Sequence, residues 1–438
     1  MFDFIKLRLY PFLRARPILI LTVLAVLFRF YLLLSFTPAC CGSDEGTYHS
    51  LAINLLRKGQ FVYTINDDSG IWKNIVYGAK PPLYPFFLYV IYRTFGINTD
   101  IVKFIQIGLS AVTGLLIYQT IKEMSSQKAG IWGLIVYSFF WETAHMSLTL
   151  MSENLYWFLL SLLIVLVIQA REHSKNNYLF IGAVLGLETL NRPTSFSLLI
   201  PVVVWLMWNK FNLKMIKNIF ILCFFCLLTL VPWTLRNYQV YKQLVFVYTD
   251  GGLNFWMGNH PNSGGSYNIP NPDIPGEIPV LKTSGVFQEI ERDRYYFGAA
   301  LAYVKKYPLE TIDTDIRKVF RTFYLYRPIV LNETNVRGSW FLIGAGSLAI
   351  NDFWEIYASY GFATVVIISV FGMLIMFKAK PKFGSIEVLL FLIFVWHLLA
   401  IAFSIWTPRY VTEIYTVMIP FGAVFLSDFY SKILKRHS

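Results

Sequence analysis

Long runs of apolar residues separated by short polar stretches dominate this chain. Many of the runs approach the roughly 20 residues that a helix needs to cross a ~30 Å hydrocarbon layer. We predict membrane spans at 17–37, 101–121, 129–147, 152–170, 178–191, 194–209, 218–235, 354–377, 386–406 and 410–429. The pattern therefore predicts an all-α polytopic membrane protein with about ten transmembrane helices. Two of the spans, 178–191 and 194–209, are short enough to tilt or break.

Other segments have a helical pattern that does not suit a membrane crossing. Residues 42–61 read as an amphipathic helix that Gly59 stops. Residues 81–96 hold about 14 apolar residues, too few for a comfortable crossing, so they favour an interfacial or re-entrant helix. Amphipathic helices are also predicted at 287–308 and 309–326, and much of the segment that contains them is expected to lie on the membrane surface.

Composition supports the membrane interpretation. The 438 residues are 56% hydrophobic and only 15% charged, whereas a soluble domain has about 25% charged residues. The net charge of +12 comes from lysines and arginines in the short loops between spans. This distribution follows the positive-inside rule, so it argues against nucleic-acid binding and predicts that both termini are cytoplasmic. The first span is expected to be retained, because no small-residue cleavage site follows it.

The spans divide the chain into three parts. Residues 1–235 form an N-terminal transmembrane module whose first outer loop, 38–100, includes the strand-like stretch 61–65. Residues 236–352 form a small outer segment, and residues 353–438 form the C-terminal spans. Neither the four cysteines nor the six histidines have the spacing of metal ligands, so no metal site is predicted.

With this topology, several charged residues fall at the outer ends of spans. They are Asp44, Glu45, Lys80, Glu153, Arg192, Arg236 and Arg409. A transporter would more naturally place its ionisable groups near the middle of the membrane, on broken helices. Acids and bases on one side of the membrane instead suggest a surface-facing reaction centre.

The acids have two interpretations each. Asp44 or Glu45 could act as a general base toward a hydroxyl, with the neighbour orienting it or binding a divalent cation. Alternatively, Asp44 only caps the following helix. Glu153 opens a span, where an acid is favoured by the helix dipole, so it could be only a helix-start signal.

The basic residues also have two interpretations. Lys80, which precedes two prolines, could present a fixed charge to a lipid phosphate, or it could be a snorkelling lysine at the interface. Arg192, Arg236 and Arg409 could clamp an anionic leaving group, since guanidinium binds phosphate in a bidentate manner. The alternative for each arginine is interfacial anchoring. The loop 251–266 could close over a sugar or form an ordinary surface turn.

Six stretches in this order resemble a known superfamily. They are SDEGTYHSLAINLLRKGQF, AKPPLYPFFLYVIYRTFG, MSENLYWFLL, LNRPTSFSLLIP, VPWTLRNYQVYKQLVFVYTDGGLNFWMGNHP and TPRYVTEIYTVMIPF. Their order is similar to that of the GT-C glycosyltransferases that use polyprenyl-phosphate sugars, including relatives of protein O-mannosyltransferases and of lipid A aminoarabinose transferases. The resemblance spans nearly the whole chain and is strongest over 40–260.

The resemblance implies a GT-C-like helix bundle with juxtamembrane helices in the first outer loop. It also implies inverting transfer of a sugar from a polyprenyl phosphate to a hydroxyl of a glycan, lipid or protein, outside the cytoplasm. Asp44 would be the base, with Glu45 and Glu153 as further catalytic acids. The expected substrate- and phosphate-binding residues are Tyr48, Lys80, Arg192, Arg236, Asn259, His260 and Arg409.

Two departures from the family pattern concern the acceptor. The second acid is often Asp in the aminoarabinose branch but is Glu153 here, and the large C-terminal domain of some relatives is missing. Two other functions stay open at this point: a flippase or transporter of lipid-linked sugars, and a polymerase or ligase with a pyrophosphate-linked oligosaccharide donor. The sequence does not identify the sugar, the acceptor, any cation requirement or the oligomeric state.

Overall fold

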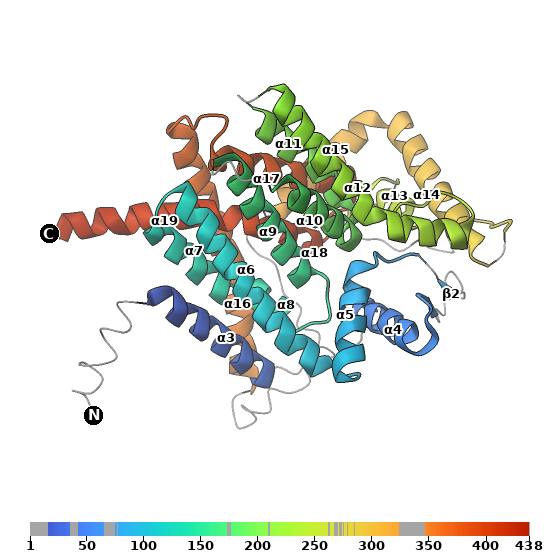
Figure 1. Ribbon diagram of the computed structural model, residues 1–438, viewed down its shortest axis with the longest axis horizontal. Coiled ribbons are helices and arrows are strands. Elements are labelled where there is room, and N and C mark those ends of the chain that lie inside the picture. The colour runs from blue at the N-terminus through green and yellow to red at the C-terminus, as the bar shows by residue number, and fades with distance from the viewer. Residues whose placement is uncertain are drawn as a thin grey trace.

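The computed structural model is almost entirely helical (Figure 1). It describes residues 16–35, 43–64, 75–76, 78–172, 177–208, 211–261, 263–266, 270, 274, 276–277, 279–283, 285–323 and 347–437. Within these residues, seven helical stretches are long and apolar enough to cross a membrane. They are α3 (Pro17–Ser35), α6 (Thr99–Met124), α9 (Glu153–Glu172), α12 (Leu213–Tyr241), α16 (Ser347–Lys378), α17 (Ile386–Phe403) and α19 (Tyr415–His437) with the short helix before it. The prediction of an all-α polytopic membrane protein is confirmed, whereas the count of ten crossings stays a prediction.

The predicted span 129–147 is not one helix. It is divided into α7 (Gln127–Phe139) and α8 (Trp141–Met146). Phe140 between them has an extended backbone, with φ −71° and ψ 126°. The backbone N–H of Ala144 donates to the Phe140 carbonyl oxygen at 3.1 Å, and the hydroxyl of Thr143 donates to the Tyr137 carbonyl oxygen at 2.6 Å, so a side chain satisfies a backbone acceptor at the end of α7.

A break in the helical backbone separates the two short predicted spans, 178–191 and 194–209. α10 (Tyr178–Asn191) ends before η2 (Pro193–Leu198), which leads into α11 (Leu199–Met207). Arg192 at the junction is extended, with φ −140° and ψ 107°, because a residue that precedes proline is disfavoured in the helical region. Arg192 is therefore the one residue between α10 and η2.

The first loop contains two helices that pack against each other. α4 (Ser43–Lys58) ends at Gly59, whose φ of 65° suits glycine, as the sequence predicted. Two short strands, β1 (Tyr63–Thr64) and β2 (Ile75–Val76), pair antiparallel after it. α5 (Leu83–Phe95) follows; its 13 residues would extend about 20 Å, less than the ~30 Å hydrocarbon layer.

Three helices contain most of the described residues between α12 and α16. α13 (Gly251–Gly258) packs on α14 (Phe287–Lys306), and α15 (Pro308–Thr322) follows directly. The two predicted amphipathic helices are therefore confirmed, the second ending four residues earlier than predicted. Figure 1 shows α13 and α14 beside the far end of α12, away from the C-terminus of the chain.

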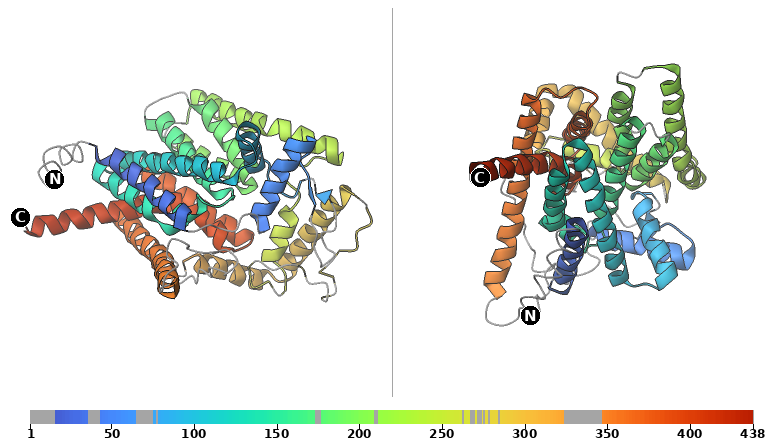
Figure 2. Two further views of the ribbon diagram at one scale, coloured as in Figure 1. Left: turned by 90° about the horizontal axis from the view of Figure 1, so that it is seen from below. Right: turned by 60° about the vertical axis from the view of Figure 1, so that its left-hand side comes forward.

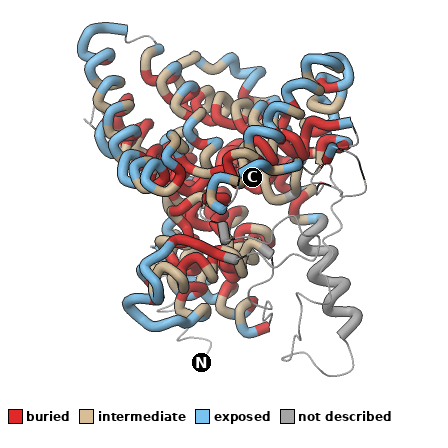
Figure 3. The backbone as a smooth tube through the Cα atoms, turned by 90° about the vertical axis from the view of Figure 1, so that its right-hand side faces the viewer, coloured by how far each residue is buried: buried red, intermediate tan, exposed pale blue. Residues whose placement is uncertain are grey.

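The bundle is organised around α9. Of the apolar stretch in α9, 78% is buried, against 22% in α3 and α12, and buried residues run through the middle of the structure (Figure 3). The end of α19, in contrast, projects beyond its neighbours (Figure 2). Glu153, the first residue of α9, is thus held inside the bundle.

Candidate active site

Asp44 lies in the first turn of α4, and two cations from distant parts of the chain contact its carboxylate. Oδ1 accepts a hydrogen bond from Nζ of Lys80 at 2.8 Å, and Oδ2 pairs with Nη1 of Arg409. Burial opposes ionisation of Asp44, but the two cations hold its pKa well below its usual range. Because Asp44 is inside the helix and its carboxylate contacts cations, the hypothesis that it only caps the helix is wrong.

Glu153 lies behind this pair and is fully buried. Its Oε1 lies 2.9 Å from Nη2 of Arg192 and also pairs with Nε of Arg409. Arg409, which belongs to α18 (Pro408–Val411), therefore contacts Glu153 and Asp44 at once. The position of Glu153 at the start of α9 is also favourable for the helix dipole, so both interpretations of this acid fit the structure.

A third acid completes the network. Oε1 of Glu413, in η3 (Thr412–Ile414), lies 2.6 Å from Nη1 of Arg192, whose guanidinium carbon is 5.5 Å from the centre of the Tyr410 ring. Three carboxylates and three cations balance one another, which avoids an uncompensated buried charge. We call this set the ion cluster: Asp44, Glu153, Glu413, Lys80, Arg192 and Arg409.

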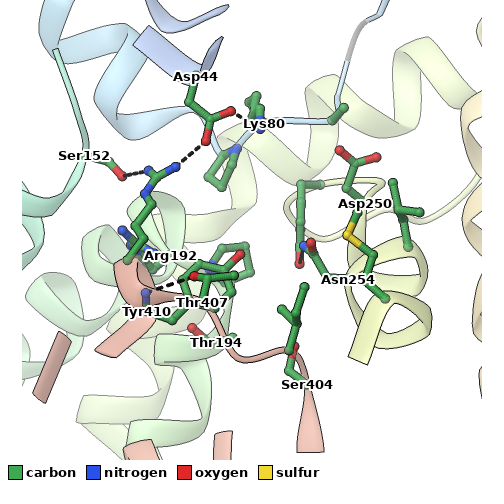
Figure 4. Close-up of a pocket in the computed structure, with 18 of the residues that line it drawn as sticks. Asp44, Lys80, Ser152, Arg192, Thr194, Asp250, Asn254, Ser404, Thr407 and Tyr410 are labelled. Carbon is green, nitrogen blue, oxygen red and sulfur yellow. Dashed lines mark hydrogen bonds and ion pairs between the residues drawn. The ribbon is translucent and has the colours of Figure 1, made fainter. Parts of the chain in front are cut away.

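A pocket of about 680 Å³ opens against the ion cluster (Figure 4). Every member except Glu153 lines it. The side chains of Lys80 and Arg409 are 24% and 22% exposed, against 0% for Glu153. An anion that enters the pocket would therefore meet Lys80 and Arg409 without reaching the buried acid.

The other side of the pocket comes from α13 and the residues before it. Tyr248, Asp250, Leu253, Asn254 and Met257 line it, and Figure 4 shows Asp250 and Asn254 across from Ser152 and Arg192. The sequence analysis missed Asp250, Asn254 and Glu413. The available signals were weak: Asp250 directly precedes two glycines, and Glu413 follows Arg409 by one helical turn.

The loop that carries Lys80 is attached to α14. Oε2 of Glu289 accepts hydrogen bonds from the backbone N–H of Gly78 at 3.1 Å, from the Tyr241 hydroxyl at 2.8 Å and from the Thr249 hydroxyl at 3.0 Å. Gly78 has no room for a side chain, since a Cβ there would lie 2.3 Å from the Tyr241 hydroxyl oxygen. Glu289 thus fixes the backbone two residues before Lys80.

Glu45 points toward a different element from its neighbour Asp44. Its Oε1 accepts a hydrogen bond from the backbone N–H of Leu150 at 3.0 Å. In the same loop, the carbonyl oxygen of Thr149 accepts a hydrogen bond from Nε2 of Gln106 at 2.7 Å. Glu45 therefore links α4 to the loop that leads into α9, which favours a supporting role over direct contact with substrate.

The remaining predicted residues divide between the pocket and sites outside it. Tyr48 lines the pocket, and its hydroxyl oxygen lies 3.4 Å from Nη2 of Arg409. Arg236 does not line the pocket: it donates to the Phe61 carbonyl at 3.0 Å and lies over the ring of Trp233 at 4.7 Å. The structure thus brings Tyr48 to the ion cluster and leaves Arg236 away from it.

Asn259 and His260 are buried outside the pocket lining. His260 stacks on Trp256 with ring centres 3.9 Å apart, and Asn259 Oδ1 lies 3.4 Å from Nζ of Lys318. Both side chains therefore support the packing of α13 and α15. In the part of the chain that the structure describes, no group of three or more His, Cys, Asp or Glu residues is arranged to hold a metal ion.

Comparison with known proteins finds one matching family model and several solved structures of similar fold. Residues 79–235 match the family model of dolichyl-phosphate-mannose-protein mannosyltransferase. The chain also superimposes on the Archaeoglobus fulgidus oligosaccharyltransferase AglB, solved with an inhibitory peptide and a dolichol-phosphate. That match has a TM-score of 0.58 and 12% identity, and it covers 97% of this chain and 52% of that one. The chain therefore shares the fold of that oligosaccharyltransferase over the matched region.

Two further solved structures are similar to this chain. The Archaeoglobus fulgidus enzyme with zinc and sulfate gives a TM-score of 0.55 at 14% identity, over 95% of this chain and 50% of that chain. This chain thus spans about half the length of the oligosaccharyltransferase. ArnT from Cupriavidus metallidurans, bound to undecaprenyl phosphate, is 14% identical over 94% of this chain and 77% of that one, with a TM-score of 0.41. No curated protein sequence gave a significant match.

Proposed function

We propose that this protein is a membrane glycosyltransferase that moves one sugar from a polyprenyl-phosphate donor to a hydroxyl acceptor. The observation that carries the proposal is the contact of Lys80 and Arg409 with Asp44 at the wall of a pocket. The cations are suited to a phosphate, and the carboxylate is suited to accept the proton of a hydroxyl. The family match over 79–235 and the GT-C fold support the same reaction class.

The proposed step is a displacement with inversion at the anomeric carbon. The acceptor oxygen forms a bond to that carbon as the bond from the carbon to the phosphate oxygen breaks. The acceptor proton goes to Asp44, and the electron pair of the broken bond leaves with the polyprenyl phosphate. The donor is a phosphodiester with one negative charge, and the leaving monoester carries close to two at neutral pH. Lys80 and Arg409 would stabilise the charge that develops.

The ion cluster also suggests how Asp44 would become a base. While Lys80 and Arg409 contact its carboxylate, its pKa is low and it is a poor proton acceptor. A donor phosphate that takes over these two cations would raise the proton affinity of Asp44 at the site of reaction. Glu153, which stays buried with Arg192, would keep Arg409 in position during this exchange.

Sidedness belongs to the proposal as well. The short loops between spans hold an excess of lysine and arginine, which predicts cytoplasmic termini and an extracytoplasmic active site. The acceptor on that side would be a glycan, a lipid or a protein hydroxyl, and a divalent cation near Glu45 stays an option. Labelling of an introduced cysteine at each end of the chain in intact cells tests the orientation.

The fold similarity to an oligosaccharyltransferase favours one alternative, a donor with a pyrophosphate-linked oligosaccharide. The two readily accessible cations of the pocket match the charge of a leaving monophosphate better than that of a pyrophosphate. The test supplies reconstituted protein with a polyprenyl-phosphate sugar or a polyprenyl-pyrophosphate sugar and measures transfer. We expect transfer from the monophosphate only. Transfer only from the pyrophosphate would contradict the proposal, and movement of either lipid across the bilayer without transfer would indicate a flippase.

A further inference from the structure

One face of α13 points into the pocket. Asp250 directly before the helix and Leu253, Asn254 and Met257 within it line the cavity, at spacings that place them on one helix face. The other face packs on α14, where Gly252 approaches so closely that a Cβ would lie 1.9 Å from a backbone oxygen of α14. The helix is therefore held rigidly with its polar side chains toward the ion cluster.

We propose that Asp250 and Asn254 bind hydroxyl groups of the donor sugar, so that α13 determines which sugar the protein accepts. This inference rests on the proposed function, since it assumes that the pocket receives a glycosylated lipid phosphate. The sequence analysis considered the loop 251–266 for sugar contact. Its Trp256 stacks on His260 and does not line the pocket.

Asp250 provides a fixed hydrogen-bond acceptor. One carboxylate oxygen, Oδ1, lies 3.3 Å from Nη2 of Arg292 on α14, and Arg292 is itself only 6% exposed. Arg292 orients the carboxylate and leaves Oδ2 without a hydrogen-bond partner among the described residues. An ionised carboxylate is an acceptor only, so Oδ2 is suited to a sugar hydroxyl.

Asn254 adds both a donor and an acceptor one turn further along α13. Its Nδ2 lies 3.4 Å from the Tyr248 hydroxyl, and within the described part of the chain its Oδ1 accepts no hydrogen bond. An amide beside a carboxylate matches neighbouring hydroxyls on a ring, where each oxygen is donor and acceptor. Leu253 and Met257, on the same face, supply apolar surface for the C–H groups of the ring.

Charge determines which end of the donor faces α13. Asp250 lines the same pocket as Lys80 and Asp44 but lies across it from Asp44 (Figure 4). A carboxylate repels a phosphate, which therefore belongs with Lys80 and Arg409. The sugar attached to that phosphate would then occupy the space between Lys80 and Asn254 (Figure 4).

The test compares binding of two probes to the full chain in lipid nanodiscs. One probe is bare polyprenyl phosphate. The other is whichever of polyprenyl-phosphate mannose, glucose or aminoarabinose supports the fastest transfer by the wild type. We expect Asn254→Ala and Asp250→Asn each to weaken binding of the sugar-bearing probe about tenfold or more, the effect of losing a buried hydrogen bond to a charged or polar group. Binding of the bare lipid phosphate should stay within about twofold, because its contacts are on the other wall.

Asp250→Asn removes the carboxylate that pairs with Arg292, and this loss can destabilise the fold. Asn254→Ala breaks no ion pair, so it tests the inference even if Asp250→Asn misfolds. Asp313→Asn is the matched control, because Asp313 is 59% exposed on α15 and distant from the pocket lining. Equal weakening for both probes would overturn the inference, as would unchanged donor binding with a raised KM for the acceptor. Failure of the proposed function has a different result: the wild type would transfer no sugar from any of the three donors.

Discussion

Arg409 bridges Asp44 and Glu153, two acids that are 109 positions apart in the chain. One acid faces the pocket and is 28% exposed, whereas the other is fully buried. The same guanidinium therefore connects a position suited to chemistry with a position suited to support. This difference in burial predicts different consequences when each acid is changed.

Replacing the buried acid should cost stability. Glu153→Gln removes the carboxylate that pairs with both Arg192 and Arg409 and leaves the ion cluster one negative charge short. Breaking a buried ion pair typically costs about 3–5 kcal/mol. We expect a large drop in the thermal midpoint of the detergent-solubilised protein. Asp44→Asn should lower it much less, because Asp44 is partly exposed. Equal midpoints for Glu153→Gln and the wild type would contradict the supporting role.

Removing the lysine should weaken donor binding. Lys80→Met deletes a charge that we place on the donor phosphate, and a hydrogen bond to a charged group is worth about 1.5–3 kcal/mol. The dissociation constant for polyprenyl phosphate should rise by about 10–100-fold, whereas Lys80→Arg should retain much of the affinity. A binding titration against lipid concentration checks this. Unchanged affinity in Lys80→Met would place the phosphate elsewhere.

The pH profile should differ between free and donor-bound protein. In the free protein the pKa of Asp44 lies below its ordinary value of 3.8, despite burial, because Lys80 and Arg409 favour the ionised form. The carboxylate is therefore ionised at all higher pH values, and the pairing would be lost only as the pH falls below that range. We expect kcat/KM to show no acid limb from Asp44 above pH 3.8, and kcat to show a higher apparent pKa. An acid limb that is present in the profile of kcat/KM and absent from that of kcat would contradict the proposal that the donor phosphate takes over Lys80 and Arg409 from Asp44.

Loosening the lysine loop should affect donor binding more than chemistry. Glu289→Gln keeps the shape of the side chain but replaces a carboxylate that accepts three hydrogen bonds, including one from Gly78. We expect the donor KM to rise several-fold while kcat changes little, since Asp44 is untouched. Glu291→Gln, on an exposed part of α14, is the control. A fall in kcat at constant KM would show that Glu289 acts on the reaction itself.

Much of the fold followed from apolar patterning, since most long runs became helices near the predicted positions. The end of α4 at Gly59 and the break before Pro193 also followed from local rules, because glycine and proline restrict the backbone by themselves. The division of 129–147 did not follow. It depends on the extended backbone of Phe140 and on the hydroxyl of Thr143, which donates to the Tyr137 carbonyl oxygen, and apolar composition does not indicate either feature.

The site was predictable where a residue's position relative to the membrane was informative. Asp44, Lys80, Glu153 and Arg409 were placed on one side by topology, and they do meet. Arg236 satisfied the same criterion but turns toward Phe61. The predicted topology gives the depth of a residue in the membrane but not its direction around the helix bundle. The packing of the helices decides which residues of equal depth face the same pocket.

Single-turnover transfer by Asp44→Asn tests the central claim most directly. The variant is loaded with a polyprenyl-phosphate sugar, mixed with acceptor, and compared with wild type and with Asp313→Asn. Removing the negative charge frees Lys80 and Arg409, so the variant should bind polyprenyl phosphate at least as tightly as the wild type. Its transfer rate should fall by about 10²–10⁴-fold, the usual contribution of a general base. A near-normal rate with bound donor would contradict the assignment of Asp44 as the base.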